Sequence, residues 1–265
     1  MHRLYYIFFI SFFLISCSKY QKLLKSTDFD MKLEKAKEYY LEEDFTRALP
    51  LLEELSSVMR GTEKAEEVSY YYAYCHYGME ENLMSAYLFD KYVRTFPKGK
   101  HAEEASYMKA FCYYLEAPRY SLESKNTERA INELQEFINN FPLSTRLSDC
   151  NKFIDELNIK LERKAFAIAE QYYITERYRA AIISLNSVLI EFPNTLYREE
   201  IQFLILESSY LLAINSIPDK KKERLEETID FFEMFKDNYP ESKYLKDINT
   251  IYTKTIKSLE ELNKI

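Results

Sequence analysis

Cys17 is the residue of this chain with the clearest chemical role. It ends a short apolar run, and the residues around it read Leu14-Ile15-Ser16-Cys17. A branched aliphatic residue, two small or aliphatic residues and then cysteine form the lipobox pattern, in which the cysteine receives a lipid once the leader is removed. Arg3 and the apolar stretch 4–15 complete a leader of the usual layout. The pattern predicts that residues 1–16 are a lipoprotein signal peptide and that Cys17 is lipidated.

An ordinary signal peptide with an unrelated cysteine is the alternative explanation of this leader. Ordinary cleavage prefers a small residue three positions before the cut, and Leu14 fits that position poorly. A membrane-spanning helix needs roughly 20 apolar residues, more than the leader offers. Ser18 is not the acid that retains some lipoproteins in the inner membrane, and residues 19–22 lack the acidic cluster that often directs export to the surface. We therefore expect a lipid anchor in the outer membrane, on the periplasmic face.

Acidic pairs are the next residues that could do chemistry. Glu42-Glu43-Asp44 and Glu80-Glu81 resemble paired carboxylates, but no base or pocket pattern accompanies them, and they fit solvated turns between helices. Gly61, Gly78 and Gly99 are the only glycines and form no phosphate-binding loop. No His/Cys spacing suggests a metal site. We expect no catalytic residue, no cofactor and no metal, so the chain is predicted not to be an enzyme.

Three cysteines remain after lipidation, and an odd number cannot pair completely. Cys75, Cys112 and Cys150 fit buried free thiols on helices. A disulfide between Cys75 and Cys112, which occupy matching positions in neighbouring repeats, is the alternative in an oxidising compartment.

The charge balance argues against nucleic acid as a partner. The chain has 36 Lys and Arg against 43 Asp and Glu, and removal of Arg3 with the leader leaves 35 against 43, a net charge of −8. Binding to phosphates needs clustered Lys and Arg. Apolar residues make up 47% of the chain, which is enough for a continuous core.

Four pairs of an aromatic residue and a proline divide the chain at similar intervals. Their prolines are Pro97, Pro142, Pro193 and Pro240. These prolines lie 45, 51 and 47 residues apart, and an acid follows each by seven residues. Proline ends one helix and a carboxylate favours the start of the next. Ala169 and Ala181, with Tyr178 between them, match the tetratricopeptide pattern, in which small residues let two antiparallel helices approach closely.

These features predict an all-α fold, a tetratricopeptide-repeat right-handed superhelical solenoid of about five helix-turn-helix units. Residues 17–28, which begin with the lipidated cysteine, are expected to form a polar tether, and residues 29–265 the repeat domain. We divide this domain into N-terminal repeats 29–142 and C-terminal repeats 143–265. One repeat cannot cover its own apolar face, so the array is expected to behave as one domain.

Two long loops are expected within the array. In the third repeat the packing alanines, Ala110 and Ala130, lie 20 residues apart instead of 12, which predicts an insert of some eight residues near Pro118. Residues 216–224 form the second expected loop, and Lys220-Lys221-Lys222 within it are expected to be solvated.

Aromatic residues form stripes on the first helices of the first three repeats. A spacing of i, i+4 and i+7 places them on one helix face. In tetratricopeptide arrays the first helix of each repeat lines the inner groove. The stripe is either core between helices or an aromatic groove for an extended client peptide, a role for which tyrosine offers an apolar face and a hydroxyl. The candidate groove residues are Tyr40, Tyr70, Tyr74, Tyr77, Tyr107, Phe111 and Tyr114.

The lipobox, the tether and five repeats of this length resemble the BamD family, the lipoprotein subunit of the machinery that folds β-barrels into the outer membrane. The version is similar to that of Bacteroidetes-type bacteria. Residues 19–26 and 72–77 carry the resemblance, and the most specific match is the third-repeat insert, residues 118–123. The pair Glu123-Ser124 departs from the expected Asp-Gln.

The resemblance implies a non-catalytic adaptor of the BAM complex, anchored by a lipid such as palmitate. Its N-terminal repeats would engage the C-terminal signal strand of unfolded outer-membrane proteins, and its C-terminal repeats would dock on a periplasmic domain of the barrel-forming assembly subunit. The alternative is another periplasmic tetratricopeptide lipoprotein adaptor, for cell-wall synthesis or division. A surface glycan-binding lipoprotein is disfavoured, because the chain has no Trp to stack on sugars.

Overall fold

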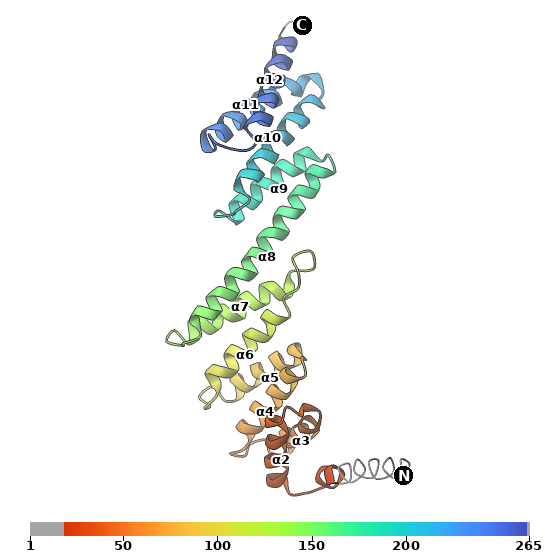
Figure 1. Ribbon diagram of the computed structural model, residues 1–265, viewed down its shortest axis with the longest axis vertical. Coiled ribbons are helices and arrows are strands. Elements are labelled where there is room, and N and C mark those ends of the chain that lie inside the picture. The colour runs from red at the N-terminus through yellow and green to blue at the C-terminus, as the bar shows by residue number, and fades with distance from the viewer. Residues whose placement is uncertain (1–18, 264–265) are drawn as a thin grey trace, which may run out of the picture. The chain divides into compact units, whose positions relative to one another are not determined.

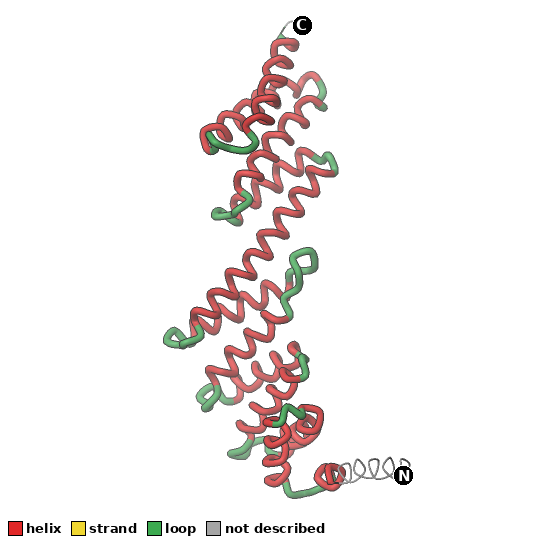
Figure 2. The backbone as a smooth tube through the Cα atoms, viewed as in Figure 1, coloured by secondary structure: helices red, strands yellow, loops and turns green. Residues whose placement is uncertain are grey.

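The computed structural model describes residues 19–263, and within this range it contains helices, turns and loops but no strand (Figures 1 and 2). The helices are α2 (Phe29–Leu41), α3 (Phe45–Val58), α4 (Ala65–Gly78), α5 (Asn82–Thr95), α6 (Ala102–Leu115), α7 (Lys125–Asn140), α8 (Leu147–Ile174), α9 (Tyr178–Glu191), α10 (Arg198–Ile214), α11 (Pro218–Asn238) and α12 (Leu245–Leu262). They form successive helix hairpins of the tetratricopeptide type, which confirms the all-α repeat fold.

Buried alanines mark the contact between the two helices of each hairpin. Ala36 of α2 and Ala48 of α3 are fully buried, as are Ala110 of α6 and Ala130 of α7. Ala169 and Ala181 repeat the arrangement between α8 and α9. Because alanine carries only a methyl group, the two backbones approach closely there, and the larger side chains around them complete the core.

Each first helix begins with acids, and most second helices end at an aromatic residue followed by proline. Glu66 and Glu67 lie in the first turn of α4, and Glu103 and Glu104 in that of α6, where a negative charge complements the helix dipole. The aromatic residue of each Phe-Pro or Tyr-Pro pair is the C-cap of α5, α7, α9 and α11. These boundaries agree with the proline punctuation of the sequence.

The tight turns inside three hairpins place a glutamate in the left-handed backbone region. Glu43, Glu80 and Glu176 have φ angles of 58°, 61° and 59°. In each turn the amide of this residue donates to the carbonyl three residues earlier, at 2.9–3.0 Å. The acidic pairs of the sequence therefore lie at inter-helix turns, as expected.

The chain divides into two compact units whose boundary lies inside α8. The N-terminal unit comprises the residues up to Pro118 with Glu123–Leu157, and the C-terminal unit comprises Arg119–Leu122 with Asn158–Ile265. The division of the repeats at 142/143, which concerns repeats rather than compact units, stays a prediction. No glycine or proline interrupts the 28 residues of α8, so one helix serves both units: Cys150 and Leu157 belong to the N-terminal core, and Phe166 and Ala169 to the C-terminal core.

Two expected irregular segments turn out to be partly helical. Residues 19–24 form a short helix within the expected tether. Leu23 is buried in the hydrophobic core formed by α2, α3 and α4, and the Tyr20 hydroxyl donates to the Arg47 carbonyl at 3.0 Å. Residues 216–224 are not a long loop, because α11 begins at Pro218, and proline is well suited to the first turn of a helix. Lys220-Lys221-Lys222 are therefore helical. The insert near Pro118 is confirmed as a loop, residues 116–124.

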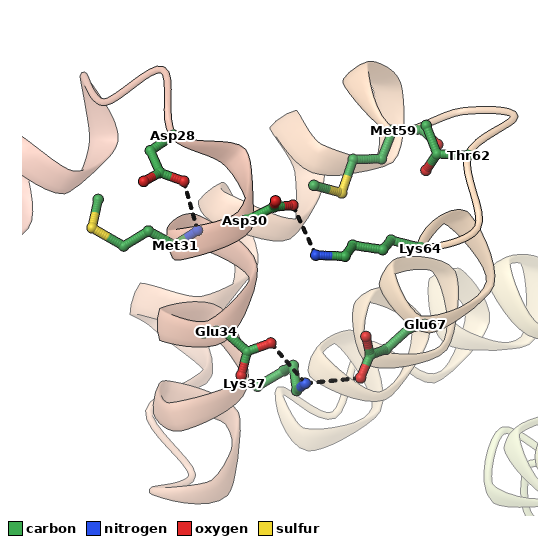
Figure 3. A network of polar contacts seen from close by, with 9 residues as sticks. All are labelled: Asp28, Asp30, Met31, Glu34, Lys37, Met59, Thr62, Lys64 and Glu67. Carbon is green, nitrogen blue, oxygen red and sulfur yellow. Dashed lines mark hydrogen bonds and ion pairs between the residues drawn. The ribbon is translucent and has the colours of Figure 1, made fainter.

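Ion pairs between first helices fix the register of the first two repeats (Figure 3). Lys64, just before α4, contacts Asp30 of α2 at 2.8 Å, and Lys37 of α2 lies 2.9 Å from Glu67 of α4. The Asp28 side chain caps α2 by accepting from the Met31 amide at 2.9 Å. Cys17 and the rest of the predicted leader lie outside the described residues.

Candidate functional site

The seven predicted groove residues lie on the first helices α2, α4 and α6 of the N-terminal unit, and their rings form a continuous series. Ring centroids are 6.3 Å apart between Tyr40 and Tyr74, 6.2 Å between Tyr74 and Tyr77, and 6.5 Å between Tyr77 and Phe111. Within α6, Phe111 stacks on both Tyr107 and Tyr114, at 5.8 and 5.9 Å. We call these seven residues, together with Phe153 of α8, the aromatic band.

Phe153 extends the band beyond the residues that the sequence identified. Its ring stacks on Tyr114 at 4.2 Å and lies 5.5 Å from Phe111. The sequence did not identify it because residues 143–265 were assigned to the C-terminal repeats, whereas the groove was sought in the first three repeats. Because Phe153 lies on α8, the aromatic band ends at the first turns of α8.

The band residues are buried or half-buried and pack against the hydrophobic cores of the N-terminal unit. Tyr107 is buried, at 9% exposed, whereas the other band residues are half-buried. Each half-buried ring packs on its neighbours with part of its surface and leaves the rest accessible. Binding of a client by these residues stays a prediction.

Three hydroxyls of the band donate to carboxylates on the next first helix. Tyr70 and Tyr74 of α4 donate to the two oxygens of Glu104 on α6, at 3.1 and 2.8 Å. Tyr114 of α6 donates to Glu156 of α8 at 2.5 Å. Burial is the main cause that raises the pKa values of Tyr70 and Tyr74, and the Glu104 carboxylate adds to it, whereas the hydrogen bond to Glu156 is the main cause that raises the pKa of Tyr114 to about 12. The tyrosine hydroxyls are therefore fixed donors at neutral pH.

Glu104 also has an arginine and a histidine as neighbours. Arg146 lies 3.8 Å from it and His101 lies 3.6 Å away. Both neighbours also contact rings of the band: the Arg146 guanidinium lies 4.4 Å from the Tyr107 centroid, and His101 stacks on Tyr70 at 4.1 Å. This polar border orients the rings but was not identified from the sequence.

The three remaining cysteines are buried free thiols on α4, α6 and α8, and no disulfide joins Cys75 to Cys112. Burial raises the pKa of Cys75 to about 12 and those of Cys112 and Cys150 to about 11. A thiol protonated at neutral pH is a poor nucleophile, so these residues act in packing. In the part of the chain that the structure describes, no group of three or more His, Cys, Asp or Glu residues is placed to hold a metal ion.

A family model described as YfiO, outer membrane lipoprotein, matches residues 29–225. The chain belongs to this family. The match extends from the first turn of α2 into α11, so it covers parts of both compact units. It agrees with the resemblance to BamD-like lipoproteins at the level of the family.

Solved structures of tetratricopeptide proteins share limited similarity with this YfiO-family chain. The P58(IPK) TPR domain matches 92% of this chain and 69% of its own, with 15% identity and a TM-score of 0.43. A putative kinesin light chain of Podosopora anserina with nearly identical TPR-like repeats matches 80% of this chain and 96% of its own, with 13% identity and a TM-score of 0.34. No curated protein matches the sequence.

The C-terminal unit of the YfiO-family chain presents a different surface. Three neighbouring hollows of about 720, 570 and 380 Å³ lie along the turns of its hairpins. Arg177 lines the first two hollows, and Arg179, Ile183 and Leu212 line the first and third. Ile183 is 61% exposed. The side chains of Arg177 and Arg179 form no ion pair with a described carboxylate.

No helix in the described part of this YfiO-family chain is both long enough and apolar enough to cross a membrane. The lipobox residues lie outside that part, so the lipid anchor at Cys17 stays a prediction.

Proposed function

We propose that this YfiO-family protein is the lipoprotein adaptor of the outer-membrane β-barrel assembly machinery, the BAM complex, in a Bacteroidetes-type bacterium. It is held by a lipid at Cys17 on the periplasmic face of the outer membrane. Membership of a family of outer membrane lipoproteins and the lipobox support this location. The adaptor has no catalytic step: it holds an unfolded barrel protein beside the barrel-forming subunit.

The aromatic band is the main support for the proposal that the N-terminal unit binds the client. Its rings form one half-buried series across α2, α4, α6 and α8. Tyr70, Tyr74 and Tyr114 are held by their hydrogen bonds to Glu104 and Glu156, so little side-chain freedom remains to be lost on binding. An extended segment with alternating apolar and aromatic side chains, as a barrel strand has, fits such a surface.

The C-terminal unit offers the candidate surface for docking on the barrel-forming subunit. Exposed Ile183 beside Arg177 and Arg179 combines an apolar anchor with cations that pair with no described carboxylate. Such a combination suits a protein interface with an apolar centre and a charged rim. We assign this surface to a periplasmic domain of the barrel-forming subunit that presents carboxylates.

Depletion of the protein, followed by quantification of outer-membrane barrel proteins, tests the function as a whole. The expected result is a fall in assembled barrels and accumulation of unfolded ones in the periplasm. Unchanged barrel levels together with a defect in cell-wall synthesis or division would overturn the proposal in favour of a different periplasmic adaptor.

Two surface variants separate the client site from the docking site. Phe111→Ala should weaken cross-linking to an unfolded barrel client and leave co-purification of the barrel-forming subunit intact. Ile183→Glu should do the reverse. Leu196, which is 92% exposed and lines none of the three hollows, provides the matched control Leu196→Glu. Equal losses in Ile183→Glu and Leu196→Glu would remove the assignment of the docking surface.

A further inference from the structure

A separate hollow of about 530 Å³ lies in the N-terminal unit, between the second helix of the first repeat and both helices of the second repeat. Its volume falls within the roughly 300–1,000 Å³ typical of small-molecule sites. No residue of the aromatic band lines it. Its walls are formed by Leu55, Ser56, Arg60, Gly61, Thr62, Ala65, Ser69, Tyr72, Leu88, Lys91, Tyr92, Thr95 and Phe96.

The hollow has an apolar floor. Leu55 of α3 is fully buried, and Leu88 and Tyr92 of α5 are 7% and 0% exposed. On α4, Ala65, Ser69 and Tyr72 follow one another at i, i+4 and i+7, so one face of that helix forms a wall. An alkyl or aryl group placed on this floor would be removed from water.

The rim carries hydrogen-bond donors that nothing in the described chain uses. Arg60 and Lys91 are exposed, and neither forms an ion pair with a described carboxylate. The half-buried Tyr72 hydroxyl has no described hydrogen-bond partner either. No Asp or Glu lines the hollow, although the whole chain has a net charge of −7.

The other hydroxyls of the lining are already used as donors. Those of Ser56, Thr62, Ser69 and Thr95 donate to backbone carbonyls three or four residues earlier, at 2.7–2.8 Å. The Tyr92 hydroxyl donates to Glu66 at 2.6 Å. Burial, followed by the nearby carboxylates of Glu53 and Glu81, raises the pKa of the Tyr72 hydroxyl, so the groups that favour an anion at the rim are the two cations.

We propose that this hollow binds a small amphiphilic carboxylate, with its alkyl or aryl group on the floor and its carboxylate at Arg60 and Lys91. The planar guanidinium donates to both oxygens of a carboxylate at once, and such charge-assisted bonds are stronger than neutral ones. A free alkyl or aryl acid and the C-terminal residue of a peptide share this chemistry. A free acid would make the site independent of the adaptor function proposed above, whereas a peptide terminus would make it a further contact for the client of that function.

Calorimetric titration of the full chain in detergent solution with 3-phenylpropanoate and hexanoate tests the site. Both acids should bind, and their primary amides should bind at least about tenfold more weakly, because an amide cannot accept charge-assisted bonds with both heteroatoms. Arg60→Gln and Lys91→Gln should each weaken binding of the acids by about tenfold.

Two exposed cations outside the hollow provide matched controls. Arg94 of α5 pairs with Asp90 at 2.9 Å, and Lys98 lies in the following loop. Arg94→Gln and Lys98→Gln remove the same charge and should leave the dissociation constants unchanged. The proposal is overturned if neither acid binds at about 1 mM, if the amides bind as well as the acids, or if the control variants weaken binding equally.

A tripeptide arm distinguishes the two sources of the carboxylate. Ala-Ala-Phe with a free C-terminus is compared with the same peptide carrying a C-terminal amide. Tighter binding of the free peptide than of 3-phenylpropanoate identifies a peptide terminus as the ligand class, and weaker binding identifies a free acid. Measurable binding of both peptides with the same dissociation constant would contradict the role of the carboxylate.

Discussion

The two compact units use their polar groups differently. In the N-terminal unit, ion pairs link α2 with α3 and α4, and buried Lys109 of α6 contacts Glu133 of α7 at 2.5 Å. Three tyrosines of that unit donate to carboxylates on the next first helix. In the C-terminal unit, Arg177 and Arg179 are exposed and pair with no carboxylate of residues 19–263, and Ile183 is exposed beside them.

The N-terminal unit therefore has a preorganised surface, whereas the C-terminal unit exposes cations and an isoleucine. Polar groups paired across helices hold the aromatic band in one arrangement, so the N-terminal unit keeps its binding surface before a ligand arrives. Cations and an isoleucine left without internal partners contribute little to the stability of the C-terminal unit, but they are free to pair with another protein. The variants below test this contrast, beginning with the largest expected effect.

Truncation of the equivalent core phenylalanine in each unit should have the largest effect. Phe137 and Phe235 each lie four residues before an aromatic-proline pair and are 0% and 1% exposed. Either change to Ala should cost about 3–5 kcal/mol. Hydrogen exchange should show lost protection in the mutated unit alone. Loss of protection across both units in each variant would instead indicate the single cooperative domain that the sequence suggested.

Loss of the Glu104 carboxylate should cost less. Glu104→Ala leaves the Tyr70 and Tyr74 hydroxyls without their acceptor, which should lower the free energy of unfolding by about 2–3 kcal/mol. Glu207→Ala in the C-terminal unit frees only Tyr173 and should cost about 1 kcal/mol. Urea denaturation measures both. Exposed Glu103 gives the control Glu103→Ala, and a similar loss in that control would refute the proposed importance of the tyrosine bonds.

Alkaline pH should destabilise the N-terminal unit selectively, because residues 158–265 contain no cysteine. Burial raises the folded pKa values of Cys75, Cys112 and Cys150 to about 11–12, whereas an unfolded thiol ionises near pH ~8.5. A raised folded pKa gives stability that is complete below the unfolded pKa and lost as pH rises toward the folded value. From pH ~8 to ~9.5 each thiol should therefore cost about 1 kcal/mol.

Urea denaturation of Cys112→Ala across this pH range measures one of these contributions. The variant should show a pH-dependent loss smaller than that of the unchanged protein by about 1 kcal/mol. An identical loss in the two proteins would mean that other groups cause the alkaline instability.

Replacement of the left-handed glutamates should have the smallest effect, and the same effect in both units. Glu43→Gly, Glu80→Gly and Glu176→Gly relieve the cost of a positive φ and should each raise the free energy of unfolding by up to about 1 kcal/mol. Glu42 has a φ of −83°, so Glu42→Gly should gain nothing and serves as the control. Thermal unfolding gives the comparison; destabilisation in all three turns would show that these glutamate side chains contribute more than the strain costs.

Much of the fold could be predicted from the sequence, because it depends on local signals. Proline after an aromatic residue ends a helix wherever it occurs, and the alanine pairs Ala36/Ala48 and Ala169/Ala181 mark hairpins at short range. No such local signal in the sequence marks the boundary inside α8. Its first turns resemble any amphipathic helix, and only the cores on either side decide which residues belong to which unit.

The rings of the candidate site were predictable, but their polar partners were not. A spacing of i, i+4 and i+7 places Tyr70, Tyr74 and Tyr77 on one face of a helix whatever follows. The partner of Tyr70 lies 34 residues away at Glu104, and that of Tyr114 lies 42 residues away at Glu156. These separations depend on how far each first helix is offset from the previous one, and the insert at residues 116–124 lengthens the second separation.

The aromatic band also gives the protein an intrinsic fluorescence signal that can report ligand binding. The chain has 24 Tyr and no Trp, so its intrinsic emission comes from phenols, and phenols that donate to carboxylates, as Tyr70, Tyr74 and Tyr114 do, emit weakly. A ligand that covers the band or displaces Glu104 would change this quenching without any added dye. In a Phe111→Trp variant, the introduced indole would be the single one of the molecule. It would receive excitation energy by transfer from the tyrosines around it.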